Sequence, residues 1–105
     1  MNTMRKAKIT ETTFYPVSIS EKGLIGFAAC LFDDKLSLSS ISVYTTPSRD
    51  IRLLFPEKTL INGKKLNVFY PINKETYESI RQAVKSKIEE LAEKVKKNEE
   101  ATLLR

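Results

Sequence analysis

The chain contains no histidine, so the residue that most often serves as a general base near neutral pH is missing. Its single cysteine, Cys30, cannot form an intrachain disulfide, and without a histidine partner it is not a candidate for thiol catalysis. Because Cys30 lies inside the apolar stretch GFAACLF, we expect a small buried hydrophobic residue. Zinc ligands are also lacking. The sequence therefore predicts a protein that is not an enzyme and that holds no metal and no cofactor.

Two further patterns offer little chemistry. Gly23 and Gly26 lie close together, but their spacing fits neither a P-loop nor a dinucleotide-binding fingerprint. Asp33 and Asp34 form the only tight carboxylate pair outside the predicted helix, where a hairpin turn is favoured over a Mg²⁺ site. We therefore expect no small-molecule substrate.

Long hydrophobic runs are missing as well. The longest, residues 24–32, is far shorter than the roughly 20 residues that a membrane-spanning helix needs. The first twelve residues lack the apolar segment of a signal peptide. These features predict a cytoplasmic protein without a membrane partner, and association with the nucleoid stays open.

The composition suits one globular domain, with 105 residues of which 41% are hydrophobic and 30% charged. We expect a loose basic arm at residues 1–7, a folded domain at 8–97 and a flexible tail at 98–105. A domain of this size has little surplus stability, so pairing with a second copy would help it.

Positive charge is unevenly distributed along the chain. Residues 49–87 hold nine basic and four acidic residues, whereas 1–48 and 88–105 carry net charges of only +1 and −1. The formal net charge of +5 therefore resides in one segment. Such asymmetry favours a polyanionic partner over solubility as the role of the charge.

The pattern of β-branched, aromatic and alternating residues predicts five strands. They cover residues 8–19, 24–32, 36–44, 51–55 and 64–70.

Local signals refine these strands. Pro16 predicts an edge strand or a bend, and the nearly continuous apolar run 24–32 predicts a strand buried on both faces. Leu36 and Leu38 are out of phase with Ile41 and Val43, which predicts a bulge near Ser39-Ser40. Asn62-Gly63 predicts a hairpin with a two-residue type I′ turn.

A long amphipathic helix is predicted at residues 74–97, after Pro71 and with Asn73 as N-cap. Its apolar residues recur at positions 77, 80, 84, 88, 91 and 95. At 1.5 Å per residue it would be about 36 Å long, roughly the width of the whole domain. Its far end therefore either frays or packs on another chain.

A basic stripe follows the helix. At about 100° per residue, Lys74, Arg81 and Lys85 project within about 40° of one another, at the border between helix and sheet. We predict phosphate contacts from these three residues and from the hairpin residues Lys64 and Lys65. Arg49, Arg52 and Lys58 are secondary candidates. The other five residues join the helix stripe only if the hairpin folds against the start of the helix.

Each lysine or arginine that contacts a phosphate releases condensed counterions, so such a stripe would bind nucleic acid largely without sequence preference. Tyr44 and Tyr70 either stack on bases or pack within the sheet. Two other interpretations stay open. The stripe is an ordinary solvated helix face, or the helix and a strand edge form a protein-interaction module in cell division.

The order of motifs resembles the SpoVG family of bacterial septation and sporulation regulators over roughly residues 8–91. Pro71-Ile72, followed by a helix with Ile80, Ala83 and Val84, resembles the family's P-I and I-x-x-A-V motifs. Asn62-Gly63 stands where the family has a D-G turn. The chain departs from the family at its histidine, here Tyr70, and at its early helix arginine, here Tyr77.

The resemblance implies a small α+β fold, in which a twisted antiparallel sheet with hairpins carries one long C-terminal helix. It also implies a homodimer that binds DNA or RNA and regulates septation or sporulation, with nucleic-acid contacts falling on residues 64–87. Neither the target sequence nor a preference between DNA and RNA follows from it.

Overall fold

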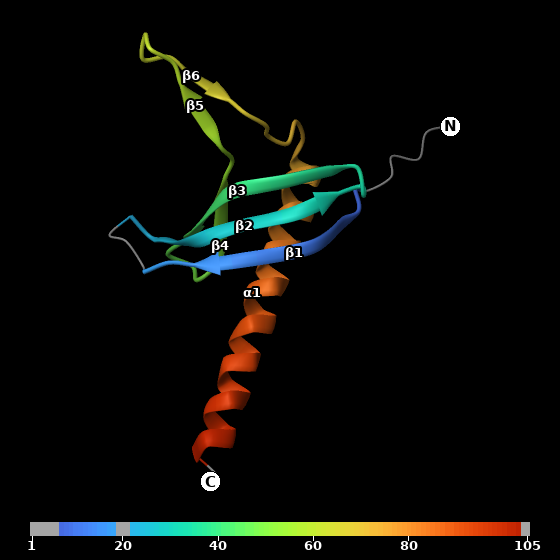
Figure 1. Ribbon diagram of the computed structural model, residues 1–105, viewed down its shortest axis with the longest axis vertical. Coiled ribbons are helices and arrows are strands. Elements are labelled where there is room, and N and C mark those ends of the chain that lie inside the picture. Colours follow the sequence, from blue (N-terminus) through green and yellow to red (C-terminus); the bar gives the residue numbers. More distant parts are fainter. Residues whose placement is uncertain (1–6, 19–21, 104–105) are drawn as a thin grey trace.

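The computed structural model describes residues 7–18 and 22–103, with side chains through Lys97. Strands β1 (Ile9–Pro16), β2 (Leu24–Phe32), β3 (Leu36–Thr45) and β4 (Ile51–Leu54) form one antiparallel sheet in chain order. Strands β5 (Glu57–Thr59) and β6 (Lys65–Asn67) form a separate two-stranded sheet, and the chain ends in helix α1 (Lys74–Leu103) (Figure 1). The expected α+β class is confirmed.

One face of the four-stranded sheet is covered by α1, which crosses behind it in Figure 1. The core between the two layers consists of Ala28, Cys30, Ile41, Val43, Leu53, Ile80 and Val84. The prediction that β2 is buried on both faces is wrong, because Phe27 points away from α1 and is 37% exposed. One helix covers one face only. The prediction of a buried Cys30 is confirmed.

The bulge predicted near Ser39-Ser40 is confirmed. Ala28 pairs with Ile41 but Cys30 pairs with Leu38, so two serines of β3 stand opposite Ala29. Ser40 has a positive φ of 59°, a conformation that lets the extra residue fit. The bulge restores the phase, so that both Leu38 and Ile41 pack toward the core.

Strand β1 is an edge strand, as Pro16 predicted. Pro16 pairs with Gly26, and the Phe14 ring lies directly over that glycine. A Cβ on Gly26 would stand 2.6 Å from the Phe14 ring and would also collide with the Tyr15 carbonyl oxygen. Glycine at this position therefore lets β1 close over the end of the core.

The predicted hairpin is present, but the prediction of a two-residue type I′ turn is wrong. The Leu60 amide donates to the Lys64 carbonyl at 2.8 Å and the Gly63 amide to the Leu60 carbonyl at 2.9 Å. Only Gly63 has a positive φ, 85°, whereas Asn62 does not. This is a three-residue loop with glycine in the left-handed position. Strand β6 is also shorter than the expected 64–70.

Helix α1 starts where predicted, because the Asn73 side chain accepts a hydrogen bond of 2.8 Å from the Thr76 amide. It continues to Leu103, where a flexible tail was expected from residue 98. Residues 104–105 and most of the expected N-terminal arm (1–6) lie outside the described residues.

Only the first half of α1 packs on the sheet. Ile80 and Val84 are fully buried, Ile88 is partly buried, and Val95 is 57% exposed. The second half extends past the sheet in Figure 1. Within the described residues, no helix is both long and apolar enough to cross a membrane.

Candidate nucleic-acid interface

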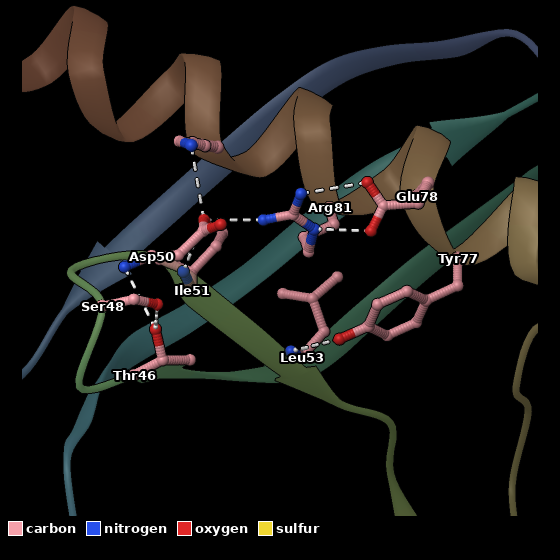
Figure 2. A network of polar contacts seen from close by, with 9 residues as sticks. Thr46, Ser48, Asp50, Ile51, Leu53, Tyr77, Glu78 and Arg81 are labelled. Atoms are coloured by element: carbon pink, nitrogen blue, oxygen red, sulfur yellow. Dashed lines mark hydrogen bonds and ion pairs between the residues drawn. The ribbon is translucent and has the colours of Figure 1, made fainter.

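Arg81, one of the predicted phosphate contacts on α1, is held by two carboxylates. Its Nη1 lies 2.6 Å from Asp50 Oδ1, while Nε and Nη2 lie 2.8 and 3.0 Å from the two oxygens of Glu78 (Figure 2). The Arg81 side chain is only 13% exposed. Both carboxylates raise the pKa of the guanidinium, Glu78 more strongly. Arg81 therefore links helix and loop rather than offering a free cation.

Asp50 is positioned by the loop between β3 and β4. Its amide donates to Thr46 Oγ1 at 3.1 Å, and its carbonyl accepts from the Thr46 amide at 2.9 Å. Its carboxylate accepts from the Ile51 amide at 2.8 Å and also lies 3.3 Å from Lys85 Nζ. The Ile51 N–H, with the charges of Lys85 and Arg81, holds the pKa of Asp50 below its usual value.

The basic stripe of the helix is therefore largely compensated. Asp50 pairs with Arg81 and Lys85, and Arg81 holds the pKa of Glu78 below its usual value. Lys74, at the start of α1, is exposed, and no carboxylate of the described residues lies within 4.0 Å of its ammonium. Of the three predicted helix contacts, only Lys74 lacks a carboxylate partner among the described residues.

The hairpin lysines are placed differently. Lys58, Lys64 and Lys65 are exposed, and none has a carboxylate within 4.0 Å in the part of the chain that the structure describes. The hairpin projects away from the sheet and from α1 (Figure 1). The condition for a single combined site, a hairpin folded against the helix start, is thus not met within one chain.

The remaining candidates, Arg49 and Arg52, lie at one end of the sheet. Arg52 on β4 pairs across the sheet with Tyr44, and its guanidinium carbon is 5.2 Å from the centre of the Tyr44 ring. This is a cation–π contact that leaves the guanidinium at the surface. Arg49 occupies the tight turn before β4 with a φ of 63°.

Sequence reasoning missed the face on which Arg52 and Tyr44 stand. That face also bears Tyr15 and Phe27, which are cross-strand neighbours on β1 and β2. Strict alternation around Gly26, Ala28 and Cys30 would have placed Phe27 opposite the core. The apolar character of the whole run concealed this signal.

Tyr70, the other tyrosine considered for stacking, lies in the segment between β6 and α1 and is exposed. Tyr77, by contrast, points its ring into the layer between helix and sheet, and its hydroxyl accepts a hydrogen bond of 3.0 Å from the Leu53 amide (Figure 2). Of the four tyrosines, Tyr77 therefore has a structural role between helix and sheet.

Among residues 7–18 and 22–97, no group of three potential metal ligands lies close together. No family model matches the chain, and no curated protein matches it. The resemblance to the SpoVG family therefore stays a prediction, and the fold and its surfaces are the basis for a functional proposal.

Proposed function

We propose that the protein is a non-enzymatic, homodimeric regulator that binds DNA or RNA mainly through phosphate contacts. The observation that supports this most is the projecting hairpin, whose Lys58, Lys64 and Lys65 are exposed without a nearby carboxylate in the described residues. Cations that do not have to exchange a protein partner for a phosphate bind it at lower cost. Lys74, Arg49 and Arg52 contribute as secondary contacts.

Arg81 and Lys85 take a different role in this proposal. Their pairing with Asp50 fixes the loop before β4 against α1, and so holds Arg49 and Arg52 in place. A cytoplasmic location and a role in septation or sporulation accompany the proposal through the resemblance to SpoVG proteins.

The salt dependence of binding tests the proposal. A labelled random 20-base-pair duplex should bind with log K falling linearly with log salt, at a slope of about −0.9 per phosphate contacted. The double variant Lys64→Glu, Lys65→Glu should bind more weakly and reduce that slope by about two contacts. Fluorescence anisotropy over a series of NaCl concentrations measures both quantities.

The matched control is Lys96→Glu, Lys97→Glu, which makes the same change in net charge at exposed positions on the far half of α1. This control should retain the wild-type slope. Equal losses in both double variants would mean that net charge, not the hairpin, determines affinity. No binding of the wild type at low salt would rule out the proposed function.

A second candidate function is a protein-interaction module in cell division. The observation that favours it is the exposure of Ile61, Leu66, Val68 and Ile72 on the hairpin and on the segment leading to α1. Exposed apolar residues gathered in one region mark surfaces that bind other proteins. Failure of every oligonucleotide to bind, with a folded protein, would favour this alternative.

A further inference from the structure

The face of the sheet opposite α1 carries a row of apolar and aromatic side chains. Tyr15, Phe27, Ser42 and Leu54 are successive cross-strand partners on β1, β2, β3 and β4. Tyr15 is 60% and Leu54 44% exposed, and Phe27 lies between them along the row. No described element covers this face, which looks toward the viewer in Figure 1.

A third aromatic ring stands beside this row. Tyr44 is two residues beyond Ser42 on β3, so it lies diagonally from Phe27 on the same face. Neighbouring strands are about 4.8 Å apart, and diagonal partners about 7–8 Å. Tyr15, Phe27 and Tyr44 therefore present three rings from three adjacent strands within the span of two or three nucleotides.

Cations border these rings at one end of the sheet. That end comprises the end of β1, the start of β2, the end of β3 and the start of β4. Arg52 lies over Tyr44, Arg49 is in the adjoining turn, and Lys22 comes just before β2. All three are exposed side chains.

The acidic residue of the same turn points the other way. Asp50 directs its carboxylate to Arg81 and Lys85 on the helix side of the sheet (Figure 2). In the described residues, no carboxylate lies within 4.0 Å of Arg49, Arg52 or Lys22. The turn thus directs its negative charge to the covered side of the sheet, away from the face on which Arg52 lies over Tyr44.

We propose that this open face is a stacking platform for the bases of single-stranded nucleic acid. Tyr15 and Phe27 would stack on successive bases. Arg52, held over the Tyr44 ring, and Arg49 in the adjoining turn would contact the phosphates. Stacking on aromatic rings tolerates any base, because every base has a π-face. A duplex keeps those faces inside its own stack, so the platform selects single strands. This inference rests on the proposed function and adds its substrate class.

The aromatic composition favours this occupant over a protein partner. Here two exposed rings, and a third that carries Arg52, are combined with cations that have no carboxylate within 4.0 Å among the described residues. Planar rings and cations together are what a single-stranded polyanion requires.

The test uses a fluorescein-labelled 12-nucleotide oligo(dT), the matching oligo(U) and a 12-base-pair duplex, measured by anisotropy. The double variant Tyr15→Leu, Phe27→Leu keeps apolar side chains but removes two rings. Its affinity for one or both single strands should fall by at least about tenfold, given the usual contribution of each stacked base. Its affinity for the duplex should change much less.

The matched control is Tyr70→Leu, because Tyr70 is 56% exposed, close to Tyr15, but lies on the segment before α1. It should bind the single strands as the wild type does. A cooperative urea transition for each variant establishes that it is folded.

Tyrosine fluorescence gives a second measurement that does not depend on a large substitution. The chain has no tryptophan, so its emission comes from its four tyrosines. Single strands should quench this emission in the wild type. Tyr15→Phe should retain the affinity, because a ring is still present, but should show a smaller quenching amplitude.

The platform is overturned if Tyr15→Leu, Phe27→Leu binds single strands as tightly as the wild type does. Loss of duplex binding in the Lys64→Glu, Lys65→Glu variant would in that case still support the proposed function. Absence of binding to every oligonucleotide overturns both. If the ring substitutions change the mass measured by light scattering but not the oligonucleotide affinity, the face is an interface between copies, and the inference is wrong.

Discussion

At the scale of single residues, Asp50 is the carboxylate that connects several elements of the fold. Its Oδ1 atom accepts from the Ile51 amide and pairs with both Arg81 and Lys85, so one carboxylate connects the loop, β4 and α1. Sequence reasoning assigned Arg81 and Lys85 to phosphate contacts because helix periodicity shows which residues share a face. It does not show an acidic partner that lies 31 residues away from Arg81.

Asp50→Asn should lower stability at neutral pH but not in acid. The pKa values of Asp50 and Glu78 are lowered in the folded protein, so the unfolded chain takes up protons first as the pH falls. Their stabilising effect is complete above about pH 5 and is lost as the pH falls through about 4 and below. Urea midpoints of wild type and variant should therefore differ at pH 7 and approach each other at pH 3.

The control for this prediction is Asp34→Asn. Asp34 pairs with Lys8 at 2.8 Å, but both side chains are more than half exposed. An exposed pair of this kind contributes little, so Asp34→Asn should shift the midpoint at pH 7 much less than Asp50→Asn does. If the urea midpoints of wild type and Asp50→Asn differ as much at pH 3 as at pH 7, Asp50 does not stabilise the fold through its charge.

Tyr77→Phe tests a polar contact inside the helix–sheet layer. The Leu53 amide on edge strand β4 donates to the Tyr77 hydroxyl at 3.0 Å. Without the hydroxyl, this amide lacks a partner, and unfolding free energy should fall by about 1–2 kcal/mol. Urea denaturation measures the change, and Tyr70→Phe on the exposed segment should leave stability within about 0.5 kcal/mol of the wild type.

At the scale of elements, the closure of β1 over β2 depends on Gly26. Gly26→Ala would bring a methyl group against the Phe14 ring and the Tyr15 carbonyl, and either β1 or the ring must move. We expect a loss of about 1–3 kcal/mol in unfolding free energy, as in other overpacked sites. Chemical denaturation measures it. Gly63→Asn is the control, because nothing lies within 4 Å of a Cβ there and asparagine tolerates its positive φ.

Helix ends and strand irregularities were predictable where a single local sequence signal determines them. Asn73 fixed the start of α1, and the change of phase between Leu38 and Ile41 located the bulge. The turn type was not predictable, because Asn-Gly is compatible with more than one hairpin loop. The run in β2 was misread because apolar character alone does not show how many layers cover a sheet.

The length of α1 was underestimated for a related reason. We took the end of the apolar stripe as the end of the helix. The helix nevertheless continues past the last position of that stripe, Val95, to Leu103. Pairs along its surface such as Lys94–Glu90, 3.6 Å apart, suit a helix half that does not pack on the sheet. The candidate site was only partly predictable, because the direction of the hairpin depends on how the chain leaves β4 and not on the hairpin residues themselves.

At the scale of the whole molecule, apolar surface gathers around the hairpin. A groove of about 330 Å³ lies between the sheet, the segment before α1 and the helix start, and it is lined by apolar side chains that include Leu36, Leu38, Phe69 and Ile72. Leu66 on β6 and Val68 just after it are also exposed. A two-stranded hairpin is marginal by itself, so contact with a second copy would stabilise it.

We therefore expect the proposed homodimer to form through the hairpin and groove. Leu66→Glu places a charge in that contact and should convert the dimer to a monomer, measured by light scattering after gel filtration at several concentrations. Val95→Glu is the matched control, because Val95 on the far half of α1 is about as exposed as Leu66. Dissociation by Val95→Glu instead would assign the contact to the helix end, and a wild-type monomer would refute the dimer.

The buried thiol of Cys30 has a practical consequence. It sits on central strand β2 at 3% exposure, and burial raises its pKa, so the sulfur is shielded and its reactive thiolate form is disfavoured. A thiol reagent such as dithionitrobenzoate can reach it only when the layers separate. Because the chain has one such sulfur, the rate of colour formation reports how often the interior opens, and any bound partner that steadies the molecule should slow that reaction.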